Sequence, residues 1–422
     1  MNELELLKRK YARLALACGV NVQKGQTVMV NADVQAADFA ALICEEAYRM
    51  GAGEVVMRYS DERVSRLHYL HQDEQTLCRV HDWQIDSRLD YLKEGACVLH
   101  VISETPGMFA DCDAAKISAA SLAWARASKA VQKYTMDNIC AWSIVAVPNA
   151  GWADQVFADA GEDGVKKLWQ AIFDCVYVDA HHDPLAIWEK RNAMFEQRVN
   201  SLNACRFTAL HFTSSLGTDL TVGLPQGHLW EGGSEQTQDG VRFNANLPTE
   251  EVFTMPHRLK TNGVVHASKP LDYNGQLIED FHLEFQDGKV CGYDARKGKA
   301  ALRALIEFDE GSSYLGEVAL VPQDSAIARS GLLFYNTLFD ENASCHLALG
   351  DAYPSCLSGG LAMSEEERKA CGANQSMTHV DFMFGTPDLR VTGIGADGQQ
   401  TLIMENGLFF AGRCDGVHMC RQ

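Results

Sequence analysis

The first half of the chain alternates two hydrophobic patterns. In one, apolar residues recur at every third or fourth position, as in an amphipathic helix. In the other, short apolar runs are bounded by glycine or polar residues, as in a buried strand. Helices are expected at 2–18, 36–50, 82–94 and 114–132, and strands at 27–31, 54–59, 97–102 and 143–148. This alternation predicts an α/β domain with a mostly parallel sheet and helices on its faces.

The pattern changes after the turn-like segment HHDP at 181–184, where one long amphipathic helix is followed by short strands and frequent turns. Asp287-Gly288 fits the two-residue turn of a hairpin across 281–295. Further helices are expected at 184–202 and 299–308, and strands at 206–212, 220–222 and 263–266. We therefore predict two domains: an α/β N-terminal domain over 1–185, and a strand-rich α+β C-terminal domain, curled or barrel-like, over 186–422.

The charge balance excludes several classes of function. The chain has 56 acidic and 37 basic residues, a formal net charge of −19, and no cluster of five or more lysines and arginines. This argues against nucleic acid or an anionic membrane as the main partner. No run approaches the ~18 apolar residues of a membrane span, and the charged N-terminal segment lacks the apolar core of a signal peptide. We therefore expect a cytoplasmic protein with neither nucleic acid nor membrane as partner.

Several common motifs are absent or out of context. The 14 cysteines form no CxxC pair, which excludes a zinc ribbon or a thioredoxin-type site. Neither HExxH nor GxSxG occurs, so a zincin protease and an α/β-hydrolase are unsupported. The glycine pattern GIGADG at 393–398 lies between strand-like segments and precedes no helix, so we interpret it as a β-turn.

Four segments of the second half carry acids or imidazoles inside apolar or tightly turned sequence. They are NLPTEEVFT at 246–254, YLGEVALV at 314–321, FDENASCHLALGDAYP at 339–354 and THVDFMFG at 378–385. An ionised side chain that enters an apolar strand needs a base or a metal as its partner. His379 and Asp381 are two residues apart, so on a strand they would point to the same face. One strand could then supply a nitrogen and an oxygen ligand together.

The charges of the candidate set suit two metal ions. The candidate ligands are Glu251, Glu317, Glu341, His346, His379 and Asp381. Four carboxylates balance two divalent cations, and neutral imidazoles add no charge. Taken singly, each segment is better explained by a structural role. Their joint occurrence favours a metal centre, and from these residues alone both interpretations stay open.

These segments resemble the signature segments of the thermophilic-type metallo-aminopeptidases, the family of aminopeptidases T, S and II. The resemblance includes PHR at 256–258, GVNVQKGQTVMVNADVQAADFA at 19–40 and AGEVV at 52–56, and so extends over nearly the whole chain. It implies a dinuclear-metal exopeptidase that removes N-terminal amino acids from peptides with broad specificity and assembles as a homodimer. The cofactors would be two divalent metal ions per chain, drawn from cobalt, zinc, manganese or magnesium.

The resemblance also implies roles for particular residues. One metal would be bound by Glu251, Glu317, His379 and Asp381, and the other by Glu317, Glu341, His346 and Asp381, with Glu317 and Asp381 as bridges. Tyr353 matches the active-site tyrosine of the family and would donate to the developing oxyanion. Glu250 would move the proton to the leaving amine, and Glu251 is preferred to Glu250 as the first ligand because of its spacing to Glu317. His257 and Asp340 are candidate partners for the imidazole ligands.

Two other functions stay open. The first is a ring-cleaving dioxygenase of the same fold that uses one iron, which would need mainly two histidines and one carboxylate. The second is a non-catalytic peptide-binding protein. The additional glutamates argue against the first, and the complete ligand pattern with Tyr353 argues against the second.

Overall fold

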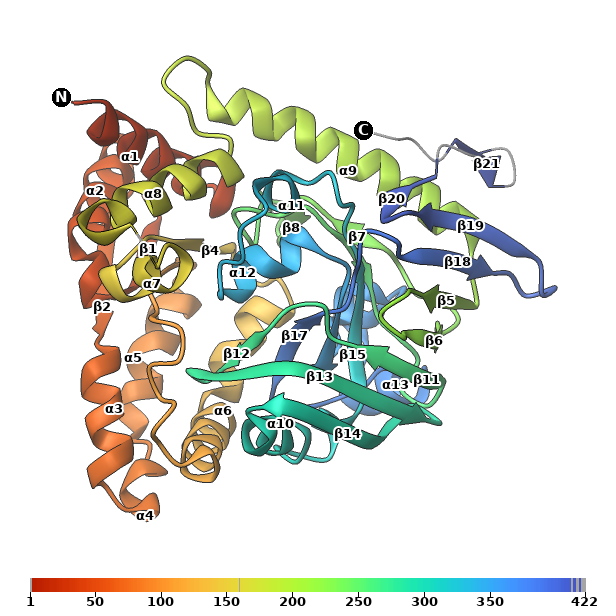
Figure 1. The fold of residues 1–422 in the computed structure, drawn as a ribbon. Coiled ribbons are helices and arrows are strands. Elements are labelled where there is room, and N and C mark those ends of the chain that lie inside the picture. The colour runs from red at the N-terminus through yellow and green to blue at the C-terminus, as the bar shows by residue number, and fades with distance from the viewer. Residues whose placement is uncertain (1, 159, 411–412, 415–416, 419–422) are drawn as a thin grey trace. The chain divides into compact units, whose positions relative to one another are not determined.

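The computed structural model describes residues 2–158, 160–410, 413–414 and 417–418 (Figure 1). The chain divides into two compact units. The first comprises Met1–Asn192, Ser234–Thr249 and Phe334–Phe339, and the second comprises Ala193–Gly233, Glu250–Leu333 and Asp340–Gln422. The change of unit falls inside the long helix α9 (Pro184–Cys205), and the boundary expected after residue 185 stays a prediction about independent domains.

The first unit contains the expected parallel sheet, whose strand order is β2-β1-β3-β4 (Figure 1). Its strands are β1 (Thr27–Asp33), β2 (Glu54–Ser60), β3 (Cys97–Ile102) and β4 (Trp142–Ala146), and a short pair is formed by β8 (Glu235–Gln236) and β9 (Arg242–Phe243). Val28, Val30 and Leu99 are fully buried in this sheet, which explains its continuous apolar strands. The α/β class predicted for the first half is therefore confirmed.

The helices of the first unit include all of those expected and several others. The expected ones are α1 (Glu3–Leu14), α2 (Ala37–Arg49), α5 (Asp82–Lys93) and α6 (Ala114–Met136). The additional ones are α3 (Glu62–His71), α4 (Glu74–Leu77), α7 (Ala150–Val156) and α8 (Gly164–Cys175). Helix α1 packs against α2, and its buried Tyr11 hydroxyl lies 3.2 Å from both the backbone nitrogen and the carbonyl oxygen of Ala146. This contact holds α1 to the end of β4.

The second unit is built mainly from two antiparallel sheets. The nine-stranded sheet contains β5 (Ala209–Thr213), β6 (Asp219–Gly223), β11 (Thr261–His266), β12 (Leu271–Tyr273), β13 (Gln276–Gln286), β14 (Lys289–Lys297), β18 (Arg390–Ile394), β19 (Gln400–Glu405) and β20 (Leu408–Phe409). The five-stranded sheet has the order β17-β16-β15-β10-β7, from β7 (Glu231–Gly232), β10 (Val252–Thr254), β15 (Leu315–Leu320), β16 (His346–Gly350) and β17 (His379–Met383). The smaller elements are α10 (Lys299–Ile306), α11 (Ala326–Ser330), α13 (Glu365–Ala370), β21 (Arg413–Cys414) and β22 (Val417–His418). The short helix α12 (Thr337–Asp340) begins in the first unit and ends at the first residue of the returning second unit. The predicted strand-rich second half is confirmed.

The hydrophobic core of this unit joins the two sheets. Phe212 of β5 packs edge-on against Phe384, which follows β17, with ring centroids 5.2 Å apart. Successive residues of β15 pack on opposite faces of the sheet. Val318 and Leu320 belong to this core, whereas Ala319 belongs to a separate hydrophobic cluster on the other face. The five-stranded sheet therefore has one core-facing side and a second side that is free to carry functional groups.

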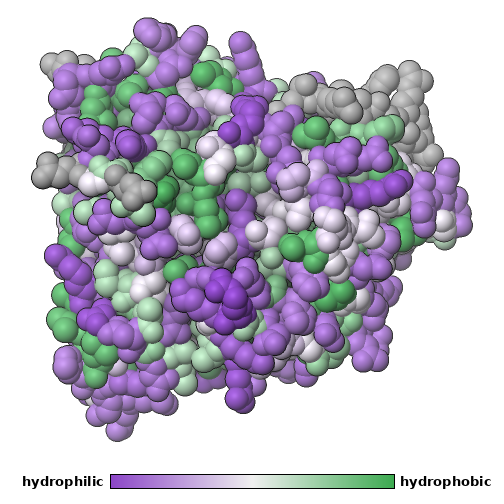
Figure 2. Space-filling view, viewed as in Figure 1, coloured by the Kyte–Doolittle hydropathy of each residue, from purple (hydrophilic) through white to green (hydrophobic). Residues whose placement is uncertain are grey.

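One face of the molecule can be described by its hydropathy. On the face drawn in Figure 2, hydrophilic residues predominate and hydrophobic residues form small groups. Within the described ranges, no helix is both long enough and apolar enough to cross a membrane.

Candidate metal centre

The five-stranded sheet collects acids and imidazoles from distant parts of the sequence. Glu317 lies on β15, His346 begins β16, and His379 and Asp381 lie on β17. Glu317 pairs with Ala348, and Ala348 pairs with Asp381, so these positions form one row across three strands. Neighbours in such a row share a face of the sheet. Glu251 directly precedes β10, two residues before Phe253, and so joins the same face.

The side chains meet at distances suited to shared cations. His346 Nε2 lies 2.8 Å from Glu251 Oε2 and 3.3 Å from Glu317 Oε1. His379 Nε2 lies 3.5 Å from Glu317 Oε2 and 3.6 Å from Asp381 Oδ1. Glu251, Glu317 and His346 form one group of potential ligands, and Glu317, His379 and Asp381 form another. Glu317 belongs to both groups and is positioned to bridge them.

Backbone carbonyls orient both imidazoles. His346 Nδ1 lies 2.9 Å from the carbonyl oxygen of Glu341, and His379 Nδ1 lies 2.7 Å from that of Asp351. A ring whose Nδ1–H donates to a carbonyl keeps Nε2 available as a ligand. The expectation that His257 and Asp340 fill this role is wrong, because carbonyl oxygens occupy the positions where those side chains were expected. His257 Nδ1 instead accepts a hydrogen bond from the amide of Leu259 at 3.2 Å.

The ionisation of the cluster reflects a concentration of negative charge. Burial, followed by the charges of Asp381 and Glu251, raises the pKa of Glu341 well above its usual value. Burial also opposes protonation of His346 and His379, yet the neighbouring carboxylates outweigh it and raise both pKa values. Burial likewise opposes ionisation of Glu317, but hydrogen bonds from both imidazoles lower its pKa to about 2. The acids in this cluster therefore require positive charge close by.

The donor set fits divalent metal ions. Asp381 Oδ1 is buried and has no partner within hydrogen-bond distance, because the His379 and His346 Nε2 atoms lie 3.6 and 4.0 Å away. Glu341 is buried and interacts electrostatically with Asp381, Glu251 and His346. Carboxylate oxygens combined with two imidazoles suit zinc, cobalt, manganese or magnesium.

The remaining sequence candidates lie around this cluster. The Tyr353 ring centroid is 5.0 Å from that of His379 and 5.8 Å from that of Phe253. Glu250 is buried, and its backbone amide donates to Asn342 Oδ1 at 2.6 Å. Glu251 lies against His346, whereas the resemblance paired it with His379. Glu251 belongs to one of the two groups of potential ligands, whereas Glu250 belongs to neither.

One acid on this face, Glu231, is not among the site residues predicted from the sequence. Glu231 lies on β7, pairs with Phe253 of β10, and accepts a hydrogen bond from Ser355 Oγ at 2.8 Å. Burial raises its pKa, and the charge of Glu317 adds to the rise. A two-residue strand has no hydrophobic period, so the only sequence signal was an acid between Trp230 and two glycines.

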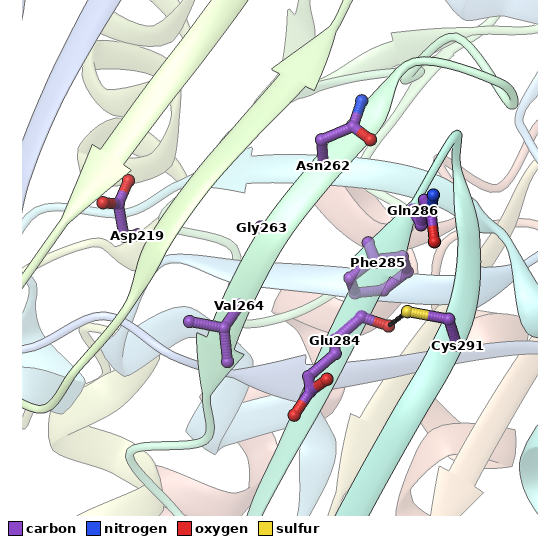
Figure 3. A pocket seen from close by; sticks show the side chains of 8 residues that line it. All are labelled: Asp219, Asn262, Gly263, Val264, Glu284, Phe285, Gln286 and Cys291. Carbon is purple, nitrogen blue, oxygen red and sulfur yellow. Dashed lines mark hydrogen bonds between the residues drawn. The ribbon is translucent and has the colours of Figure 1, made fainter.

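A separate hollow lies on the nine-stranded sheet. Figure 3 shows its lining on β6, β11, β13 and β14, where the Cys291 thiol donates to the backbone carbonyl of Glu284 at 3.4 Å. Other lining residues include Asp219, Asn262 and Phe285. It shares no residue with the acid and imidazole cluster, so we do not assign the chemistry to it.

The close approach of β16 and β17 gives a first prediction. Gly350 pairs with His379 and has φ +118°, and a Cβ there would lie 2.0 Å from the carbonyl oxygen of Thr378. Gly350→Ala should push β17 away, lowering the free energy of unfolding by at least about 3 kcal/mol and reducing the metal content. Gly398→Ala is the matched control, because φ there is +79° with open space around it, and should cost about 1 kcal/mol. Equal losses in urea unfolding for the two variants would contradict the steric argument.

The geometry of the cluster indicates a class of protein. A buried cluster of carboxylates and imidazoles with one shared acid is typical of the two-metal centres of hydrolases. Residues 5–409 match the model of the family described as thermophilic metalloprotease (M29). The chain belongs to this family and is a metallopeptidase.

The relatives agree with that membership. The chain is 42% identical to aminopeptidase AmpS of Bacillus subtilis (strain 168) over 398 residues, covering 94% of this chain and 97% of the relative. It is also 42% identical to aminopeptidase T of Thermus thermophilus over 399 residues, with the same coverage of each. The solved structure of the wild-type Thermus thermophilus enzyme superposes with a TM-score of 0.87 at 40% identity, covering 96% of this chain and 99% of that one. A 2,5-dihydroxypyridine dioxygenase from Pseudomonas putida KT2440 has a TM-score of 0.54 at 11% identity, covering 98% of this chain and 99% of that one, which shows a shared fold alone.

Proposed function

We propose that this metal-dependent aminopeptidase uses two divalent metal ions to hydrolyse the N-terminal peptide bond of peptides, with broad specificity. The observation that carries the proposal is that Glu317 belongs to two groups of ligand atoms. One ion would be held by Glu251, Glu317 and His346, and the other by Glu317, His379 and Asp381. Glu341 would add the fourth negative charge, so that four carboxylates balance two divalent ions.

Other groups of the protein would have separate roles in the reaction. Two such ions would polarise the scissile carbonyl and lower the pKa of a water molecule towards neutrality. The Tyr353 hydroxyl would donate a hydrogen bond to the oxyanion that develops on the carbonyl oxygen. Glu250, the buried acid that is not among the ligands, would carry the proton to the leaving amine. The backbone carbonyls behind His346 and His379 keep both rings in the orientation that binding requires.

The proposal also covers the metal ions, the substrates, the assembly and the cellular location of the enzyme. The ions would be cobalt, zinc, manganese or magnesium, and the substrates would be peptides with a free N-terminus. The enzyme would act as a homodimer in the cytoplasm. The names of the relatives, which are aminopeptidases, support peptide substrates, and the acidic composition argues against nucleic acid or an anionic membrane as partner.

The proposal is tested by removing and restoring the metal. Purified protein is stripped with a chelator, reloaded with each of the four ions, and assayed for release of the chromophore from leucine and arginine anilides. We expect activity to vanish on stripping and to return with metal at close to two ions per chain. Absence of turnover with every ion would overturn the aminopeptidase, and one iron per chain with oxygen consumption would establish the dioxygenase instead.

A further inference from the structure

Four strands of the five-stranded sheet carry an acid or an imidazole on the face of the metal centre, and Glu251 directly precedes the fifth, β10. Glu231 is the acid on β7, the outermost strand. It pairs with Phe253, which in turn pairs with Ala319, the neighbour of His346 in the same row. Glu231 thus lies on the same side of the sheet as the ligand groups. It is separated from the strand of Glu317 by β10 alone.

Glu231 is a surplus charge in this region. Four carboxylates already balance two divalent ions, so the ions do not require a fifth. The polar partners of Glu231 Oε2 are the Ser355 hydroxyl at 2.8 Å and the Cys356 thiol at 3.9 Å, and both are neutral. Glu231 is partly buried, and a partly buried carboxylate with neutral hydrogen-bond partners is stabilised when a cation approaches it. The Glu231 carboxylate is therefore suited to bind a positively charged group.

We propose that Glu231 binds the α-ammonium group of the N-terminal residue of the substrate. This inference rests on the proposed function, and it identifies how the enzyme would select a free N-terminus. Strands two positions apart are ~10 Å apart, and the charges of Glu231 and Glu317 interact across that gap. In a peptide, only one carbon separates the α-nitrogen from the scissile carbonyl. An ammonium beside Glu231 therefore leaves the carbonyl directed towards the ligand group of Glu317.

The surroundings of Glu231 fit the end of a peptide chain. Cys356, which approaches Glu231 Oε2, belongs with Leu357 and Phe253 to one buried hydrophobic cluster, and Tyr353 packs against that cluster. Extra residues before the N-terminal one would have to enter this packed region. The arrangement favours removal of single N-terminal residues over cleavage within a chain.

The test compares two inhibitors on the metal-loaded wild-type enzyme and on Glu231→Gln. One is 1-amino-3-methylbutylphosphonate, which has the α-amine, and the other is 3-methylbutylphosphonate, which lacks it. We expect the wild type to prefer the amino compound and Glu231→Gln to lose that preference by about 30-fold or more. KM should rise for leucine and arginine anilides alike, and metal content should be unchanged. Glutamine keeps an oxygen for the Ser355 hydroxyl, so the change removes charge and little else.

The controls separate this inference from the proposed function and from misfolding. Wild-type activity with an unchanged inhibitor preference in Glu231→Gln would overturn the ammonium site and leave the aminopeptidase standing. A loss confined to the arginine anilide would overturn it in favour of a pocket for basic side chains. Ser355→Ala removes only the hydroxyl that holds Oε2, and we expect it to weaken the preference several-fold. If Glu231→Gln fails to bind metal or to fold, Ser355→Ala decides, and an unchanged preference there overturns the proposal.

Discussion

Replacement of Glu317 by glutamine is expected to empty the metal centre and abolish hydrolysis. The two oxygens of Glu317 approach different imidazoles, at 3.3 Å from His346 Nε2 and 3.5 Å from His379 Nε2. Glutamine has nearly the same shape but replaces one oxygen by an NH2 group, which cannot bind a cation, and it removes the charge shared by the two ions. We expect kcat/KM to fall on the order of 10³-fold or more, together with the loss of bound metal.

The measurement combines metal analysis with thermal unfolding. Metal that binds only the folded state raises the melting temperature, so the increase on adding metal should be present in the wild type and absent in Glu317→Gln. Glu284→Gln is the matched control, because the same chemical change is made on β13 at a side chain that is 55% exposed. If Glu317→Gln still bound two ions and turned over substrate normally, the proposed bridging role of Glu317 would be contradicted.

The fold of the first unit could be predicted because local signals and burial agree there. Strands β1 and β3 are largely buried apolar runs, and β3 was expected at the residues where it is found, Cys97–Ile102. Helix α6 begins after Asp113, whose side chain accepts a hydrogen bond from the amide of Ala115, as a helix N-cap does. In the second unit, Asp287 and Gly288 have φ values of 49° and 84°, which confirms the two-residue hairpin turn.

The elements that were missed had weak or ambiguous patterns. Helix α3 presents Val64, Leu67 and Leu70 to solvent, so its apolar residues do not mark a buried face. Its start is set locally by Asp61, whose side chain accepts a hydrogen bond from the amide of Arg63. Strand β7 has two residues and exists because it pairs with β10, which no local pattern could indicate.

The candidate site was predictable in its residue types and not in its pairings. Acids inside apolar strands, such as Glu317 in β15, are costly enough to be noticed in a sequence. Which acid lies beside which imidazole depends on strand register, and this is why Glu251 meets His346 and not His379. The carbonyls that orient the imidazoles could not be inferred at all, because every residue has a carbonyl and only the fold selects those of Glu341 and Asp351.

Tyr353→Phe is expected to leave the metal centre intact and slow the reaction itself. The ring lies 5.0 Å from His379 and 5.8 Å from Phe253 between centroids, and phenylalanine keeps both contacts. Only the hydroxyl is lost. If it donates to the oxyanion, its interaction strengthens as charge develops, so kcat should fall by about 10²- to 10³-fold while KM and metal content stay near their wild-type values.

A control must show that the loss of activity is specific to the Tyr353 hydroxyl and does not follow from removing another tyrosine hydroxyl of the same unit. Tyr273→Phe is the control, since Tyr273 lies on β12 in the nine-stranded sheet and its variant should keep the wild-type kcat. Single-turnover kinetics with the leucine anilide would show whether the slowed step is bond cleavage. An unchanged kcat in Tyr353→Phe would exclude the oxyanion role. A fall in metal content would instead mean that the hydroxyl supports the ligands, and the stabilisation of the oxyanion would then have to come from the ions themselves.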